Sequence, residues 1–265
     1  LRSSYDREDR TSTIHMVSAY AAANKLVLGQ IKTDAKSNEI TAIPELLALL
    51  DIKGCLVSID AMGCQTEIAE TILQQGGDYL LAVKGNQPKL FEAVRQALAP
   101  LAATPLCAET MTLEKAHGRI DGREYHVMAA GELAAQFPHW KQLHSIGVAI
   151  SYRVENMQKI TIEQRYFISS KALVQDEFAR AVRGHWAIEN SLHWVLDVTM
   201  GEDDCPIYRG DAAEILACIR HMGLNMLRAE TSRKASVRRK QKIAGMSSEY
   251  LETVLNAGLK KLGEI

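Results

Sequence analysis

The most chemically suggestive stretch of the sequence is HWAIENSLHW, residues 185–194, which places two histidines and a glutamate between two tryptophans. His185, Glu189, His193 and Asp197 follow one another at intervals of four, so a helix would carry them on one face. Imidazole and carboxylate groups bind metals and phosphates and carry protons. Three interpretations are open: a metal site, part of a catalytic centre, or the polar rim of an amphipathic helix.

A zinc site fits this spacing poorly. Helical zinc motifs carry histidines at positions i and i+4, with a glutamate beside the first. Here the histidines are eight residues apart and Glu189 lies midway between them. The tryptophans also have two interpretations: Trp186 or Trp194 could stack on an unpaired nucleobase, as exposed aromatic side chains do, and we expect at least one of them to lie in the core.

A second acidic residue, Asp60, closes a short apolar run. Leu56, Val57 and Ile59 precede it, a pattern typical of a buried strand. Ligands of parallel α/β sheets gather at the carboxyl ends of strands, and separated carboxylates such as Asp60 and Glu189 suit Mg²⁺, which prefers oxygen ligands. Two such ions activate the nucleophile and stabilise the leaving oxygen of a phosphodiester. The structural alternative is that Asp60 caps the following helix.

A cluster of basic residues lies near the C-terminal end. The segment RAETSRKASVRRKQK, residues 228–242, has seven Lys and Arg residues and one Glu, although the whole chain has a formal net charge of −1. Clustered cations displace counterions from a polyanion, so the segment is a candidate DNA-backbone contact, and a solvated helix face is the alternative. Phosphate contact is assigned to its central cations and, more weakly, to a polar turn in VKGNQP: Arg233, Lys234, Arg238, Arg239, Lys84 and Asn86.

The N-terminal part of the chain predicts a β-hairpin followed by a helix. The strands are expected at residues 12–20 and 25–33, on either side of a short turn. Apolar residues recur at helical spacing over 37–51. We expect this helix to start nearer Ala42, because Pro44 is tolerated only close to a first turn.

The following part predicts an α/β sheet. Short apolar strands, one ending on Asp60 and one in DYLLAVKGNQP (residues 78–88), alternate with helices over 65–75 and 88–98. Such alternation favours a parallel sheet that is covered on both faces. From about residue 102 to 170 the signals are mostly β, with a short helix at 132–136, and from about 174 the chain is helical.

The composition is that of a globular protein. Hydrophobic residues make up 47% of the chain and charged residues 24%, and no apolar run reaches the length of about 18 residues that a membrane helix needs. The five cysteines form no Cys-x-x-Cys pair, which favours reduced thiols. We therefore expect a cytoplasmic protein with no signal peptide and no membrane partner.

Three segments together resemble the H-repeat-associated proteins, which are insertion-sequence transposases of the DDE type. They are IKTDAKSNEITAIPELLALLDIKG, IDAMGCQTEIAETILQQGGDYLLAVKGNQ and HWAIENSLHWVLDVTMGEDDC, and the likeness runs from Leu1 to about Leu255. The resemblance implies a ribonuclease-H-like mixed sheet with flanking helices, a β-rich insertion before the last catalytic Glu, and a helical C-terminus. In that family the second carboxylate closes DAMG, here Asp60, and the third is the Glu of HWxxEN, here Glu189.

The resemblance also implies a function. We expect a DNA transposase catalytic domain that uses Mg²⁺ or Mn²⁺ for strand cleavage and strand transfer at insertion-element ends. Its partner would be double-stranded DNA of the element ends and the target. The protein would bind this DNA as a homodimer, in the bacterial cytoplasm and associated with the nucleoid. The expected parts are the first part of the core, the β-rich insertion and the helical part with the catalytic Glu and the basic segment, over residues 1–101, 102–172 and 173–265.

The sequence departs from the family pattern in two places. The broader group has Tyr, Arg and Lys at −7, −4 and +7 from the last Glu, where this chain has Val182, His185 and Leu196, so His185 and His193 are taken to contact DNA instead. The family's first Asp lies in Asp-Gly-Lys-Thr, upstream of LRGS, and this sequence begins at LRSS. We therefore expect these 265 residues alone not to cut DNA at a useful rate, and the alternative function is a catalytically inactive DNA-binding remnant.

Overall fold

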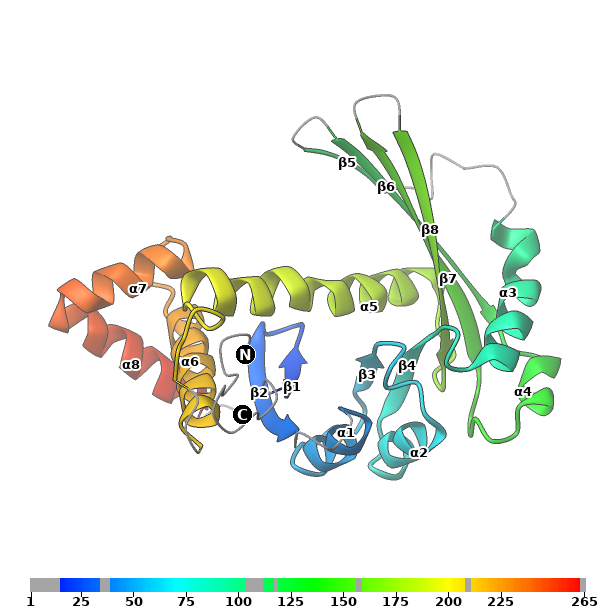
Figure 1. Cartoon of the computed structure of the whole chain (residues 1–265), viewed down its shortest axis with the longest axis horizontal. Coiled ribbons are helices and arrows are strands. Elements are labelled where there is room, and N and C mark those ends of the chain that lie inside the picture. Colours follow the sequence, from blue (N-terminus) through cyan, green and yellow to red (C-terminus); the bar gives the residue numbers. More distant parts are fainter. Residues whose placement is uncertain are drawn as a thin grey trace. The chain divides into compact units, whose positions relative to one another are not determined.

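The computed structural model describes residues 15–33, 39–102, 112–116, 119–155, 159–207 and 211–262. The chain divides into two compact units (Figure 1). Asp51–His185 form one, called here the sheet unit, and Leu1–Leu50 with Trp186–Ile265 form the other, called here the helical unit. Each unit is described by itself.

The sheet unit is built on six strands in the order β3-β4-β8-β7-β6-β5. Only β3 and β4 are parallel, and every other neighbouring pair is antiparallel. The two short strands that alternate with helices are parallel, as predicted, and the strands of the β-rich segment extend the same sheet antiparallel. Helix α2 (Thr66–Gln74) lies in the crossover that a parallel pair needs, whereas the long strands that follow are joined antiparallel. The strands are β3 (Leu56–Ile59), β4 (Asp78–Val83), β5 (Thr112–Ala116), β6 (Arg119–Ala129), β7 (Ser145–Glu155) and β8 (Lys159–Ser169).

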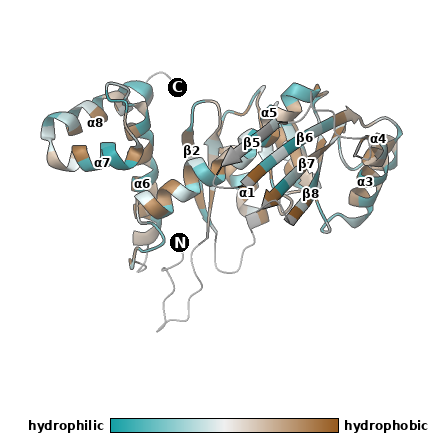
Figure 2. Cartoon of the chain, turned by 90° about the horizontal axis from the view of Figure 1, so that it is seen from above, coloured by the Kyte–Doolittle hydropathy of each residue, from teal (hydrophilic) through white to brown (hydrophobic). Residues whose placement is uncertain are grey.

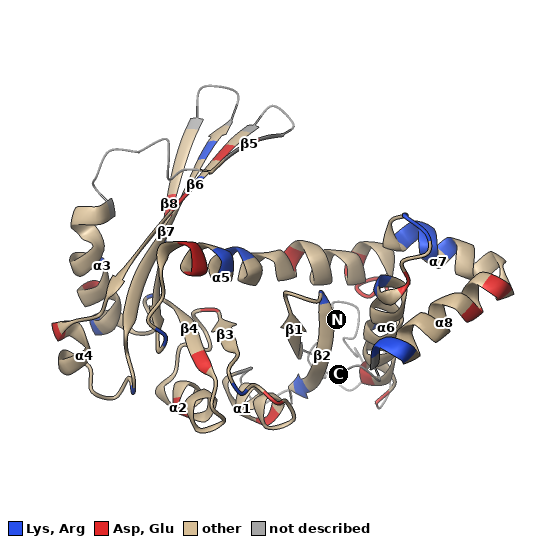
Figure 3. Cartoon of the chain, turned by 180° about the vertical axis from the view of Figure 1, so that it is seen from behind, with Lys and Arg blue, Asp and Glu red and all other residues tan. Residues whose placement is uncertain are grey.

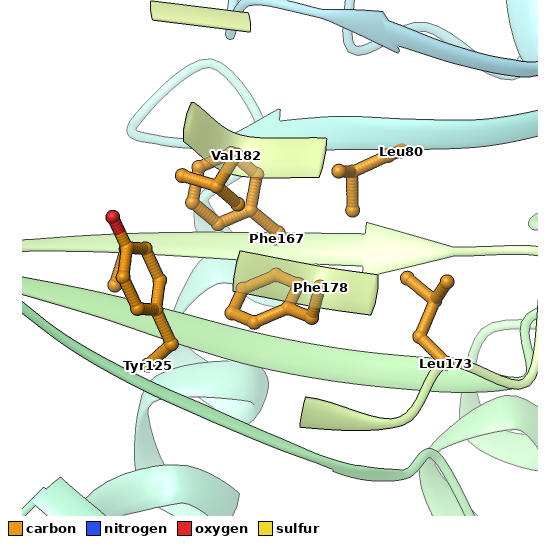
Figure 4. Packing of buried hydrophobic residues seen from close by; sticks show 7 residues of the cluster. Leu80, Tyr125, Phe167, Leu173, Phe178 and Val182 are labelled. Carbon is orange, nitrogen blue, oxygen red and sulfur yellow. The ribbon is translucent and has the colours of Figure 1, made fainter. Parts of the chain in front are cut away.

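Helices cover both faces of this sheet, and hydrophobic residues recur along β6, β7 and β8 (Figure 2). On one face, Phe178 of α5 packs edge-on against Tyr125 and Phe167 (Figure 4). Gly147 makes this approach possible, because a Cβ there would lie 2.6 Å from the Phe178 ring.

On the other face of the sheet, Phe91 of α3 packs edge-on against Tyr166 of β8. Tyr166 precedes Phe167, and successive side chains of a strand point to opposite faces. The helices are α2 (Thr66–Gln74), α3 (Pro88–Ala102), α4 (Glu132–Gln136) and α5 (Gln175–Ile188).

The helical unit contains a separate two-stranded sheet and several helices. Strands β1 (His15–Ala21) and β2 (Leu26–Thr33) pair antiparallel, as the hairpin prediction requires; residues 12–14 of that prediction lie outside the described residues. Asn225 of α6 binds both backbone groups of Val27, with its Oδ1 accepting from N–H at 2.9 Å and its Nδ2 donating to C=O at 2.8 Å. The helices are α1 (Glu39–Ala48), η1 (Glu189–His193), η2 (Val195–Thr199), α6 (Ala212–Ala229), α7 (Val237–Met246) and α8 (Ser248–Leu262).

Helix α1 corrects one expectation about its start. The helix begins at Glu39 and not near Ala42, so Pro44 is its sixth residue and lies beyond the first turn. Proline removes one backbone N–H from the helix, and the apolar face compensates by burying Leu46 and Leu47. Packing of the amphipathic face therefore outweighs the local preference of proline.

The mixed α/β fold predicted from the sequence is confirmed, and it is consistent with the ribonuclease-H-like core that the resemblance implies. The three-part division into 1–101, 102–172 and 173–265 stays a prediction. The described cysteines Cys55, Cys64, Cys205 and Cys218 are free thiols. Over the described ranges, no helix combines the length and the apolar character needed to cross a membrane.

Candidate active site and DNA-binding surface

Asp60 directly follows β3, at the carboxyl end of that strand. Its Oδ1 accepts hydrogen bonds from the backbone N–H groups of Met62, at 3.2 Å, and Gly63, at 3.4 Å. Helix α2 begins only at Thr66, and its N-cap is Gln65, so Asp60 does not cap that helix. The residue is exposed and closes a tight turn, which leaves its carboxylate accessible to a cation from solvent.

The turn that follows β3 is held by two side-chain amides from the loop after β4. Asn86 Nδ2 donates to the carbonyl of Ala61 at 2.6 Å, and Gln87 Nε2 donates to that of Cys64 at 3.0 Å. Asn86 therefore supports the turn, a role that the sequence did not reveal. Lys84 is exposed two residues earlier, and phosphate contact by Lys84 or Asn86 stays a prediction.

His185, near the end of α5, contacts strand β3. Its Nδ1 lies 3.2 Å from Oγ of Ser58, two positions before Asp60. His185 therefore contacts β3 close to the strand end that Asp60 follows. Sequence reasoning missed Ser58, although a lone hydroxyl in the apolar run LVSI was an available signal.

Glu189 begins the π-helical turn η1 and is not inside a regular α-helix. Its Oε2 lies 3.5 Å from Nδ1 of His193, and the two side chains are 59% and 48% exposed. A second π-helical turn, η2, follows. The helix expected over this motif is present, but its turns here are π-helical and not α-helical, and Glu189 and His193, four residues apart, remain adjacent. π-Helical turns are rare and occur frequently at functional sites.

Further acids surround the π-helical segment. Burial and the negative charge of Asp203 raise the pKa of Asp197. Burial raises the pKa of Glu202, and the charges of Asp197 and Asp203 add to it against the opposing effect of Arg220. Such repulsion between carboxylates favours a bound cation. Within either unit, the described residues include no group of three or more His, Cys, Asp or Glu side chains arranged to hold a metal ion.

His221 of α6 is a buried histidine that sequence reasoning missed. Burial and the positive charge of His193 lower the pKa of His221 to about 4, so its imidazole is neutral near neutral pH. The residue is 7% exposed, and its Nδ1 has no hydrogen-bond partner in the part of the chain that the structure describes. A single histidine in an apolar helical pattern carries no signal that separates this environment from an ordinary core position.

The two candidate metal ligands belong to different units. Asp60 lies in the sheet unit and Glu189 in the helical unit. The approach of their carboxylates to within about 8 Å, which a two-metal site would need, therefore stays a prediction. Within the sheet unit, His185 contacts Ser58, two residues before Asp60. Within the helical unit, His193 contacts Glu189.

The basic segment 228–242 contains two kinds of cation. Arg228 and Lys240 turn inward: the Arg228 guanidinium donates to the carbonyls of Lys25, at 2.8 Å, and Ser191, and Lys240 forms an ion pair with buried Glu230. The remaining cations of the segment are exposed, and Lys and Arg gather on α7 and at one end of α8 (Figure 3). The exposed set includes all four cations predicted to bind DNA: Arg233, Lys234, Arg238 and Arg239.

The tryptophans near Glu189 are both exposed, which corrects the expectation that at least one lies in the core. Trp186 is 39% exposed and Trp194 is 56% exposed, and the buried tryptophan is Trp140 at 5%. Exposed large apolar side chains mark interaction surfaces when they are grouped. Stacking of Trp194 on an unpaired base stays a prediction.

Comparison with known proteins supports the resemblance seen in the sequence. The model of the transposase DDE domain family matches residues 1–226, a range that includes Asp60 and Glu189. The chain therefore belongs to the DDE transposase family, and within it to the H-repeat-associated group.

Two relatives come from Escherichia coli K12. The proteins YbfL and "H repeat-associated putative transposase YhhI" are each 48% identical over 261 residues, which cover 96% of this chain and 69% of theirs. The structure of the piggyBac transposase synaptic complex with hairpin DNA aligns with a TM-score of 0.41 and 10% identity over 94% of this chain and 53% of that one, a similarity too low to assign function.

Proposed function

We propose that this chain carries the DNA-processing centre of an insertion-element transposase. The reaction is metal-dependent phosphoryl transfer: water cleaves a strand at the element end, and the freed 3′-OH then attacks target DNA. The family assignment supports a reaction of this class. The observation that carries the proposal is the position of Asp60, an exposed carboxylate at a strand end that does not cap the next helix.

Asp60 and Glu189 are the proposed ligands of Mg²⁺ or Mn²⁺. Both are exposed carboxylates, the donor type that these ions prefer. The ion would polarise the phosphodiester and increase the acidity of a bound water. Asn86 holds the turn that carries Asp60, and His185 and His193 bind phosphate oxygens beside the two carboxylates.

The exposed cations of the basic segment are the proposed backbone contacts. Double-stranded DNA of the element ends and the target is the partner, bound by a homodimer in the bacterial nucleoid. Two arginines stand in the first turn of α7, where the helix dipole disfavours positive side chains. An anion bound at that helix start removes this unfavourable interaction, which supports phosphate as the ligand of the segment.

The test is binding of Mn²⁺ by variants with one carboxylate replaced. Asp60→Asn and Glu189→Gln should each weaken Mn²⁺ affinity at least tenfold, measured by electron paramagnetic resonance of the free ion. Glu67→Gln, an exposed acid in the first turn of α2, is the matched control and should bind as the unmodified chain does. Unchanged Mn²⁺ binding in both active-site variants would overturn the assignment.

A nicking assay on element-end DNA separates the two candidate functions. Strand cleavage with Mg²⁺ or Mn²⁺ that is lost in Glu189→Gln supports the transposase. DNA binding without cleavage under any of these conditions supports the alternative, a catalytically inactive DNA-binding remnant.

A further inference from the structure

A pocket of about 330 Å³ lies in the helical unit where the loop after α6 meets α8. We propose that this pocket binds a phosphate group of the DNA backbone, an inference that rests on the proposed function. One wall is the end of α6 and its following loop, and the other is one face of α8. The lining residues are Ala229, Glu230, Thr231 and Ser232 on the first wall, and Thr253, Ala257, Lys260 and Lys261 on the second.

The loop wall is fixed by the carboxylate of Glu230, which is 1% exposed. This carboxylate accepts hydrogen bonds from the hydroxyl of Ser232, from the backbone N–H of Arg233 at 3.1 Å, and from the hydroxyl of Tyr250 at 2.6 Å. Tyr250 belongs to α8, so one buried group joins the two walls. A wall that is already ordered loses little conformational entropy when a ligand binds.

The negative charge of Glu230 is balanced inside the protein. Lys240 Nζ lies 3.1 Å from a Glu230 carboxylate oxygen and also donates to the carbonyls of Leu227, at 3.1 Å, and Glu230. The ammonium thereby covers the carboxyl end of α6 as well. Because Lys240 neutralises the carboxylate and hydrogen-bonds these carbonyls, the loop wall of the pocket offers little to attract a cation.

The exposed charged side chains that line the pocket are positive. Lys260 and Lys261 are exposed on the α8 wall, and Arg233 and Lys234 directly follow the loop wall. The Arg233 guanidinium lies over the ring of Tyr250, 5.1 Å from its centroid, which orients it beside the buried anchor. Two lysines in the lining, with two further cations next in sequence to the loop wall, favour a polyanion, and the two alanines of the lining leave room for its phosphate oxygens.

The structural alternative is that the two lysines only complement the dipole of α8, since cations are favourable in the last turn of any helix. That role requires no pocket and no ligand. The two interpretations differ in what happens when the pocket is filled without changing its charge. Ala257→Leu does this, because residue 257 lines the pocket and carries no charge.

The experiment measures the salt dependence of DNA binding by the full chain. The double variant Lys260→Gln with Lys261→Gln should make the negative slope of log affinity against log salt shallower by about 0.9, the value for one lost phosphate contact. Ala257→Leu should weaken binding several-fold at one salt concentration. The matched control, Lys53→Gln with Lys171→Gln in the sheet unit, makes the same change in net charge and should leave the slope unchanged.

Three results would overturn the inference. Equal slopes for the lysine variant and the unmodified chain, together with unchanged affinity of Ala257→Leu, would assign Lys260 and Lys261 to the helix dipole alone. Thermal stabilisation by inorganic pyrophosphate with an unchanged DNA slope would make the pocket a site for a free anion. Absence of any DNA binding by the unmodified chain would overturn the proposed function along with the pocket.

Discussion

Replacing Lys240 with methionine should strongly destabilise the helical unit, whereas the same change at Lys242 should not. The Lys240 side chain is 9% exposed and its partner Glu230 is 1% exposed, while Lys242 lies two residues further along α7 and is exposed. Removing one partner of a buried ion pair costs about 3–5 kcal/mol. Glu230 keeps its hydrogen bonds from Ser232, Tyr250 and a backbone N–H. We therefore expect the free energy of unfolding to fall by about 3 kcal/mol, the lower end of this range.

Urea unfolding followed by far-ultraviolet circular dichroism measures this loss. With a denaturant slope of about 2 kcal/mol per molar, a loss of about 3 kcal/mol lowers the unfolding midpoint by about 1.5 M. Lys242→Met is expected to leave the midpoint within about 0.3 M, because surface substitutions change stability by less than about 0.5 kcal/mol. Equal midpoints for the two variants would show that the buried pair does not hold this unit together.

The same network predicts an acid-sensitive stability. Burial alone would raise the pKa of Glu230, but hydrogen bonds from Ser232, Tyr250 and Lys240 outweigh it and lower the pKa to about 2, from an ordinary value of 4.5. Because the folded-state pKa is the lower one, the contribution is complete above about pH 4.5 and is lost as the pH falls toward 2. At about 1.4 kcal/mol per unit this amounts to about 3 kcal/mol. Glu230→Gln should flatten the stability profile over that range, and a profile with the unmodified steepness would refute the assignment.

Three further outcomes test other parts of the account. Neutralising the four exposed cations of the basic segment should make the negative slope of log DNA affinity against log salt shallower by about 3 to 4. An unchanged slope would reassign these cations to a solvated helix face. Asn86→Ala removes the hydrogen bond to Ala61 and should weaken Mn²⁺ binding several-fold without changing the unfolding midpoint, and equal Mn²⁺ affinity would show that the turn needs no such support. Trp194→Ala should weaken binding to DNA ends with unpaired bases while Trp194→Phe retains it, and equal loss in both would argue against stacking. The four cations are Arg233, Lys234, Arg238 and Arg239.

The elements that could be predicted are those whose signal is local. The hairpin was visible because two β-rich runs flank a short polar turn, and the helix after Asp60 was visible from its apolar spacing. Asp60 was placed at a strand end by three apolar residues and the acid after them. In each case, neighbouring residues alone determine the pattern.

The features that escaped prediction depend on distant parts of the chain. The antiparallel pairing of β4 with β8 joins residues 83 to 89 positions apart, so the alternation of short strands and helices predicts the parallel β3–β4 pair but not which strand lies beside β4. Lys240 belongs to a run of charges that is typical of a solvated face, whereas in the fold its ammonium is buried against the Glu230 carboxylate and the carbonyls at the end of α6. The π-helical turn at Glu189 was not predicted, although the burial of Leu192 and Leu196 in one cluster agrees with the helical spacing of these residues.

The central claim is that Asp60 and Glu189 bind one divalent cation between them. Crystals of the chain soaked in Mn²⁺, with diffraction data collected at the manganese absorption edge, test it most directly. We expect an anomalous peak about 2.0–2.3 Å from a carboxylate oxygen of each residue. A peak that is bound by only one of the two carboxylates, or no peak at either, would contradict it.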